Sequence, residues 1–328
     1  MAKRKVIRSI GVLTSGGDAP GMNACVRAVV RTACALDMRV FGIHNGLQGL
    51  IDGTIEPMEA SDVSGIIGKG GTMLGTARCK EFFYKRGRKI AADVIQAFGI
   101  DALVVCGGDG SFRGASELYK DFGIPFVGLP GTIDNDMYGT DYTIGFATAI
   151  NTAVEAIDKI RDTAQSHRRI FFVEVMGRHS GALALEAALA SGADAVLIPE
   201  TKSDITQLAK DIKAAYARGR RSYIVIVAEG DEAGNAYEIC GKVEKKLDGK
   251  GRVCVLGHVQ RGGSPVAFDR VLASRMGCAA VKTLKRGRTN VFIGMVKGKI
   301  AYTPIETVIR NKCKTDISDD EILKIIAT

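Results

Sequence analysis

Short apolar runs rich in β-branched residues alternate with longer amphipathic stretches along the whole chain. The runs predict strands at Ile7–Leu13, Val40–Ile43, Ala102–Cys106, Phe126–Leu129, Ile170–Val175, Ala195–Ile198, Tyr223–Val227 and Val253–Leu256. The stretches predict helices at Met22–Leu36, Ala147–Ala164, Gly181–Leu189, Ile205–Ala217 and Phe268–Lys285. This alternation is typical of parallel sheets covered by helices on both faces. We therefore expect an α/β fold.

The chain has 328 residues. At roughly 100–200 residues per domain, that length suits about two domains. No apolar run approaches the roughly 18 residues that span a bilayer, so we expect no membrane partner. The eight cysteines include no CxxC pair, and several lie inside apolar runs. Such cysteines are typical of a reduced, cytoplasmic protein.

The charge balance is basic, with 45 Lys and Arg against 36 acidic residues and a formal net charge of +9. Nucleic acid and small anionic ligands both suit such a chain. The sequence contains no Trp and lacks long basic runs, so stacking platforms and polybasic arms are both missing. We expect small anions as ligands and no nucleic acid.

A glycine-rich loop, Ser15–Asn23, connects the first expected strand to the first expected helix. Consecutive glycines let backbone amides approach a ligand closely, and the helix N-terminus that follows favours anions. The loop therefore predicts a phosphate site. A plain tight turn with Pro20 near the helix start fits the same residues, and both interpretations stay open.

A second glycine-rich loop, Gly107–Ser111, follows the strand expected at Ala102–Cys106. Asp109 has glycine on both sides, which would expose its carboxylate at the carboxyl end of the strand. There it could hold Mg²⁺ beside a polyphosphate bound by the backbone amides. The alternative is a carboxylate that only caps the next helix.

A third loop, Pro130–Asp136, follows the strand expected at Phe126–Leu129. If this segment is extended, alternation places Asp134 and Asp136 on the same side, as a general base and an orienting carboxylate. The alternative is a pair of turn carboxylates that bond their own backbone. We expect the three loops to form one composite pocket.

Cationic side chains recur beside glycines further along the chain, in Arg168–Arg169, Met176–Gly181 and Leu256–Ser264. The planar fork of arginine suits phosphate oxygens. Each segment alone fits a surface salt bridge as well. Together they indicate a phosphorylated substrate.

Five segments in order, 11–24, 107–111, 130–136, 176–181 and 257–265, closely resemble the bacterial-type 6-phosphofructokinase family. The resemblance covers essentially the whole chain. It implies a Mg²⁺-assisted kinase that moves the γ-phosphoryl group of ATP to the 1-hydroxyl of fructose 6-phosphate. It also implies a homo-oligomer, usually a homotetramer, of subunits with two similar domains, each a mostly parallel sheet flanked by helices. The expected domains are 1–145 with 260–308, and 146–259 with 309–328.

The resemblance also assigns roles to individual residues. The catalytic residues are Asp134 as general base, Thr132 beside the transferring group, and Arg78. The ATP site comprises Gly17, Arg78, Cys79, Gly108, Asp109, Gly110 and Ser111, with Asp109 as the Mg²⁺ residue. The sugar-phosphate site comprises Thr132, Ile133, Asp134, Arg169, Met176, Gly177, Arg178, Glu229, Arg252, His258, Val259, Gln260 and Arg261. In the family, the positions of Arg169 and Arg252 reach in from a neighbouring subunit.

An inter-subunit effector site for ADP or phosphoenolpyruvate is implied as well. Its residues are Arg27, Arg31, Arg161, Gly192, Asp194, Arg218 and Arg220. Ala60, Ser61 and Gly65 depart from the Arg, Tyr and Asp of many regulated members, so the regulation stays open.

The phosphoryl donor depends on two positions. Members that use pyrophosphate commonly carry Asp at the position of Gly110 and Lys at that of Gly131, so the glycines here favour ATP. Leu47 and Phe83 depart from residues that many ATP-dependent members place near the nucleotide. The alternatives are a pyrophosphate-dependent enzyme and a non-catalytic sugar-phosphate sensor. The chain has neither a dehydrogenase GxGxxG pattern nor a hydrolase GxSxG pattern.

Overall fold

A computed structural model describes residues 6–167, 169–247 and 249–327, and the chain divides into two compact units. Unit 1 comprises Met1–Thr132, Met137–Ala147 and Arg261–Cys313. Unit 2 comprises Ile133–Asp136, Thr148–Gln260 and Lys314–Thr328. The chain therefore passes between the units several times, and the short segment Ile133–Asp136 groups with unit 2.

Unit 1 is built on a seven-stranded sheet in the order β11-β10-β5-β4-β1-β2-β3. Its strands are β1 (Ser9–Ser15), β2 (Arg39–Ile43), β3 (Ile55–Pro57), β4 (Ala102–Gly107), β5 (Phe126–Pro130), β10 (Val291–Val296) and β11 (Lys299–Pro304). The central strands run parallel, while β3 and β11 pair antiparallel at the two edges. β1, β4 and β5 are entirely buried, as expected for strands covered on both faces.

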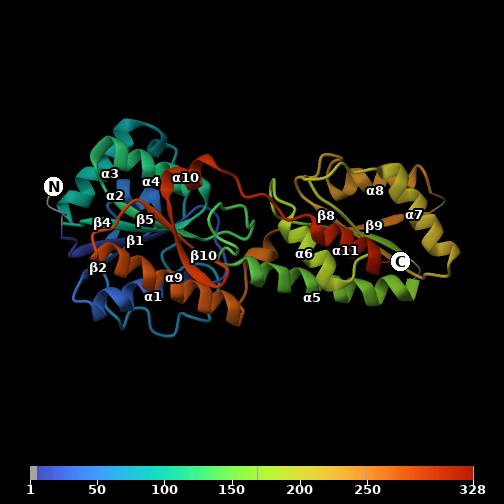
Figure 1. The fold of residues 1–328 in the computed structure, drawn as a ribbon, viewed down its shortest axis with the longest axis horizontal. Coiled ribbons are helices and arrows are strands. Elements are labelled where there is room, and N and C mark those ends of the chain that lie inside the picture. Colours follow the sequence, from blue (N-terminus) through green and yellow to red (C-terminus); the bar gives the residue numbers. More distant parts are fainter. Residues whose placement is uncertain (1–5, 168, 248, 328) are drawn as a thin grey trace. The chain divides into compact units, whose positions relative to one another are not determined.

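Helices cover both faces of this sheet, with α1 and α9 on one face and α3, α4 and α10 on the other (Figure 1). The elements are α1 (Met22–Ala35), α2 (Leu47–Asp52), the 3₁₀ helix η1 (Glu81–Phe83), α3 (Lys85–Ala97), α4 (Asp109–Phe122), α9 (Ala267–Lys285) and α10 (Ile305–Arg310). Gly277 of α9 lies so close to α1 that an added Cβ would be 2.8 Å from the Ala28 Cβ.

Unit 2 has a four-stranded, fully parallel sheet in the order β7-β8-β6-β9. Its strands are β6 (Ile170–Val175), β7 (Ala195–Leu197), β8 (Tyr223–Ala228) and β9 (Gly251–Val255). Its helices are α5 (Phe146–His167), which begins in unit 1, α6 (Ala182–Ser191), α7 (Ile205–Ala217), α8 (Ala236–Glu244), the 3₁₀ helix η2 (Gly257–Arg261), which ends in unit 1, and α11 (Ser318–Ile326). Phe172, Val225, Ile212 and Ile239 form part of its hydrophobic core.

The expected α/β class is confirmed, and all eight expected strands are present with ends shifted by at most a few residues. The additional strands β3, β10 and β11 include the antiparallel edges of unit 1. Within the described residues, no helix has the length and apolar character needed to cross a membrane. All eight cysteines are free thiols.

Candidate active site

The three glycine- and aspartate-bearing loops begin at one edge of the unit 1 sheet. In the parallel register Ser15 of β1 pairs with Gly107 of β4, and Gly107 pairs with Pro130 of β5. The Gly131 amide also donates to the Gly107 carbonyl at 3.1 Å. Because parallel strands end at the same edge, the starts of all three loops are neighbours.

The first loop needs glycine at two places where the backbone turns. Gly16 has φ 91°, and Gly21, the N-cap of α1, has φ 107°, both in the left-handed region. Gly17 has a different reason to be small, because a Cβ there would lie 3.2 Å from a guanidinium nitrogen of Arg261. Arg261 was expected with the sugar-phosphate residues, and the structure places it in unit 1 against Gly17.

Asp109 is the first residue of α4, and Gly108 before it is the N-cap. Among the described residues no side chain caps this helix, and Asp109 follows the N-cap position, so the alternative interpretation of Asp109 as a cap is wrong. The Asp109 Oδ2 instead accepts from Arg113 Nε at 2.7 Å, and the carboxylate side chain is 47% exposed. A Cβ at Gly108 or Gly110 would meet nothing within 4 Å. The amino end of α4 therefore offers open space beside a carboxylate.

Arg78 and Cys79 lie on the chain that leads to η1. Arg78 is exposed, whereas Cys79 packs against the core of unit 1 and its pKa is raised by burial. Leu47 is buried against α4, where a Cβ on Gly114 would be 2.9 Å from the Leu47 Cδ1. Phe83 is 82% exposed. Of the two positions that depart from many ATP-dependent members, Leu47 is therefore packed inside unit 1, whereas Phe83 is accessible to ligands.

The third loop bends rather than staying extended. Asn135 has φ 48°, a left-handed conformation that interrupts the alternation of side chains. Asp134 is buried, at 7% exposure, while Asp136 is exposed. The expectation that both carboxylates lie on one side of an extended segment is therefore wrong. The Thr143 hydroxyl supports the loop by donating to the Thr132 carbonyl at 2.6 Å.

Residues expected in the sugar-phosphate site gather in unit 2 at the carboxyl end of β6. The Arg178 Nε lies 3.7 Å from the Asp134 Oδ2, and the Arg178 backbone amide donates to the Glu229 Oε1 at 2.8 Å. The Met176 amide donates to the Oε1 of fully buried Gln260 at 3.3 Å. Arg178 has φ 54° and Gly177 has φ 146°. The strained turn holds the exposed guanidinium of Arg178 beside the buried carboxylate.

Arg169 and Arg252 lie at the amino ends of the strands of the unit 2 sheet, opposite to the carboxyl end of β6. Arg169 directly precedes β6, and Arg252 pairs with Phe171 near the start of that strand. At about 3.3 Å per residue, the length of β6 separates Arg169 from Met176 by roughly 20 Å. One subunit therefore does not bring these two arginines to the others. His258 and Val259, in η2, are exposed at the carboxyl-end edge. Arg168 lies outside the described residues.

A cavity of about 530 Å³ in unit 2 contains part of the expected effector set. It is lined by Arg161, Gln165, Ser166, Asp194, Arg220, Arg221 and Ser222. Arg161 also donates to the Gly192 carbonyl at 2.9 Å, and Arg220 pairs with Asp194. Burial raises the pKa of Asp194, against the lowering effect of the Ile224 amide and of both arginines. Gln165, Ser166 and Ser222 were missed because uncharged residues on a helix and a loop give no sequence signal.

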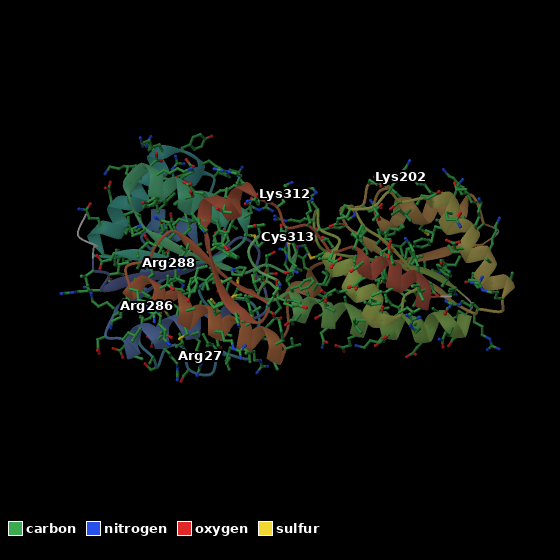
Figure 2. The ribbon with its side chains drawn as sticks, in the orientation of Figure 1. Arg27, Lys202, Arg286, Arg288, Lys312 and Cys313 are labelled. Carbon is green, nitrogen blue, oxygen red and sulfur yellow. The ribbon has the colours of Figure 1, made fainter. Side chains whose placement is uncertain are left out.

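The remaining effector residues lie elsewhere. Arg218 is the exposed C-cap of α7 and does not line the cavity. Arg27 and Arg31 belong to α1 in unit 1, where Figure 2 labels Arg27. Within one chain the cavity is therefore formed by only part of the expected set.

The donor chemistry fits Mg²⁺ bound largely by a ligand. Within the residues that the structure describes, no group of three or more His, Cys, Asp or Glu side chains could hold a metal ion. Mg²⁺ keeps several waters and is usually held by one or two carboxylates together with substrate phosphates. Half-exposed Asp109, beside the open backbone of Gly108 and Gly110, matches that mode.

Known proteins resemble this chain over nearly its whole length. A family model described as Phosphofructokinase matches residues 9–284. An "ATP-dependent 6-phosphofructokinase 1" of Thermus thermophilus is 53% identical over 306 residues, which cover 93% of this chain and 95% of the relative. An "ATP-dependent 6-phosphofructokinase" of Bacillus pumilus is 51% identical over 310 residues, covering 94% of this chain and 96% of the relative.

Solved structures show the same fold. A phosphofructokinase structure from Saccharomyces cerevisiae aligns with a TM-score of 0.86 and 39% identity, covering 98% of this chain but only 48% of that chain. A pyrophosphate-dependent phosphofructokinase from Marinobacter aquaeolei aligns with a TM-score of 0.83 over 96% of this chain and 88% of that chain. Its identity is 24%, so this likeness concerns the fold alone.

Proposed function

Because the chain belongs to the phosphofructokinase family, we propose that it transfers the γ-phosphoryl group of ATP to the 1-hydroxyl of fructose 6-phosphate. The products are ADP and fructose 1,6-bisphosphate. The chain is an ATP-dependent 6-phosphofructokinase, a glycolytic kinase, as its close relatives are named. We further assign the steps of this reaction to individual residues. We also propose a cytoplasmic location, which suits eight free thiols.

The observation that carries the proposal is the buried carboxylate of Asp134 next to the exposed guanidinium of Arg178. Their 3.7 Å separation puts a proton acceptor beside a cation suited to phosphate. A carboxylate at 7% exposure is an uncommon feature unless it has a task or a fixed partner. We assign Asp134 as the base that accepts the proton of the sugar hydroxyl as the phosphoryl group arrives.

The other roles follow from charge. Phosphoryl transfer depends on positioning and on neutralising the charge of the transferring group. The amino end of α4, with open Gly108 before it and open Gly110 in its first turn, binds the donor phosphates, and Arg78 neutralises them. The Thr132 hydroxyl lies beside the transferring group. Mg²⁺, held through Asp109 and the donor phosphates, supplies additional charge neutralisation when it is bound.

A second subunit completes the sugar-phosphate site in this proposal. Arg169 and Arg252 sit at the edge of the unit 2 sheet opposite to Met176 and Arg178. In a homotetramer, Arg169 and Arg252 of a neighbouring copy would complete this site. The unit 2 cavity with Arg161, Asp194 and Arg220 is proposed to bind ADP or phosphoenolpyruvate as an effector.

The first experiment tests the base. General-base assistance typically contributes about 10²–10⁴-fold, so Asp134→Asn should lose turnover by roughly that factor while it still binds fructose 6-phosphate. ADP release in a coupled assay measures turnover, and calorimetry measures sugar-phosphate binding. Asp162→Asn makes the same chemical change at an exposed position of α5 and serves as the matched control. Unimpaired turnover of Asp134→Asn would contradict the assignment.

The second measurement compares phosphoryl donors. Gly110 leaves open space on α4, and a carboxylate there would repel the α-phosphate of a nucleotide. We expect turnover with ATP and little with pyrophosphate. Gly110→Asp should lower turnover with ATP without disturbing the fold. Faster turnover with pyrophosphate than with ATP in the unaltered enzyme would refute the donor assignment.

A further inference from the structure

The chain between β3 and η1 forms no helix or strand, although every one of its residues is described. Arg78 and Cys79, which we have assigned to the donor site, lie near the end of this segment. Backbone turns supply some of its hydrogen bonds, and side chains of other elements supply the rest. The position of Arg78 therefore depends on the groups that hold the residues before it.

Asn23, the second residue of α1, holds this segment. Its side chain is buried, at 3% exposure. The Nδ2 donates to the carbonyls of Lys69 and Gly70, both at 3.1 Å, and the Oδ1 accepts from the Met73 amide at 2.7 Å. One side-chain amide thus uses two donors and an acceptor on three peptide groups, a set that no other side chain of this size can satisfy.

Two threonines extend the attachment toward Arg78. The Thr14 hydroxyl lies 2.8 Å from the Thr72 hydroxyl and donates to the Gly75 carbonyl at 2.9 Å. The Thr76 hydroxyl donates to the Gly16 carbonyl at 2.7 Å. The segment is therefore fixed to the first glycine loop at a residue only two positions before Arg78.

We infer that Asn23 is a positioning residue for phosphoryl transfer, acting through Arg78. The inference rests on the proposed function, which makes Arg78 the cation for the donor phosphates. Among the described residues, the hydrogen bonds of the Asn23 side chain go to backbone groups of Lys69, Gly70 and Met73, so its role in this inference is to align the segment. Misplacement of a charged group by about 1 Å can lower a rate by roughly a hundredfold.

Asn23→Asp tests the inference with little change in volume. It keeps an acceptor for the Met73 amide but turns a carboxylate oxygen toward two carbonyl oxygens. Well below the unfolding temperature, we expect kcat to fall about tenfold or more, with KM for fructose 6-phosphate changed less than twofold. Asn290→Asp is the matched control, because the Asn290 Oδ1 accepts a backbone amide, that of Phe126, at the opposite edge of the same sheet. It should keep kcat within about twofold.

A double-substitution cycle with Arg78→Ala separates positioning from a merely structural role. If Asn23 acts through Arg78, Asn23→Asp should weaken the binding of a non-hydrolysable ATP analogue, measured by calorimetry, when Arg78 is intact. Added to Arg78→Ala, the same substitution should weaken that binding little further. Additive losses in the cycle, or a lower unfolding temperature with unchanged kcat, would overturn the inference. If Asn23→Asp does not fold, Thr72→Val removes the Thr14 contact and should lower kcat in the same direction.

The cycle also keeps this inference distinct from the proposed function. Absence of ATP-dependent phosphorylation in the unaltered enzyme would refute the proposed function. Binding of the ATP analogue would still report whether Asn23 and Arg78 are coupled.

Discussion

At the scale of single residues, the structure explains why particular positions of the glycine loops are glycine. Gly16 and Gly21 adopt left-handed conformations, and Gly17 leaves room for the Arg261 guanidinium. The sequence suggested a phosphate loop or a tight turn at this place, and the positive φ angles show that the turn exists. The contact with Arg261 could not be predicted, because the two residues are far apart in the sequence.

Gly17→Ala tests that contact. Its Cβ would lie 3.2 Å from a guanidinium nitrogen, so the flexible Arg261 side chain must shift. The backbone of Gly17 is outside the left-handed region, so the fold should be retained. We expect KM for fructose 6-phosphate to rise about tenfold, through loss of one charge-assisted contact. Steady-state kinetics check this, with Gly241→Ala, which meets nothing within 4 Å, as the control. Unchanged KM would show that Arg261 does not serve the substrate from this position.

At the scale of elements, strands were easier to predict than helices with polar sequences. Continuous apolar runs such as Ile170–Val175 locate buried parallel strands directly. α3 begins with several basic residues and was missed. Its Arg88 is buried, because the Nε donates to the Asp121 Oδ2 at 2.7 Å and a terminal nitrogen donates to the carbonyls of Phe82 and Phe83. That burial depends on tertiary partners, which local periodicity does not show.

The helix α7 should respond to pH through its N-cap. Asp204 accepts from the amides of Thr206 and Gln207, and these bonds lower the pKa of its carboxyl group. A lowered folded-state pKa means that the stabilisation is present above the ordinary Asp pKa and is lost as pH falls through the folded value. Amide hydrogen exchange in the first turn of α7 should therefore lose protection in acid. Asp204→Asn keeps a cap acceptor and should remove this pH dependence; an unaltered dependence would contradict the assignment.

At the scale of the whole molecule, the clearest expectation is that catalysis requires more than one copy of the chain. Arg169 and Arg252 lie at the amino ends of the unit 2 strands, remote from Met176 and Arg178 at the carboxyl end of β6, so we expect a neighbouring copy to supply them at each proposed sugar-phosphate site. The family resemblance, and no feature of composition or periodicity, suggested this sharing. The strand register of unit 2 supplies a physical reason for it.

Mixed oligomers test the sharing. Asp134→Asn and Arg252→Ala chains should each be nearly inactive alone. When they are dissociated and reassembled together, about a quarter of the sites should combine an intact Asp134 with an intact Arg252 from another chain. Recovery of turnover in a coupled assay measures this, with separately reassembled chains as controls. No recovery in verified mixed oligomers would mean that each subunit uses its own residues.

The exposed ring of Phe83 makes an optical experiment possible. The chain contains no Trp, so Phe83→Trp would introduce one indole against a background of tyrosine and phenylalanine. At 82% exposure, the ring is not needed to fill the core. Its emission would shift when a nucleobase covers it and stay constant when only pyrophosphate is present, giving a titration signal that needs no turnover.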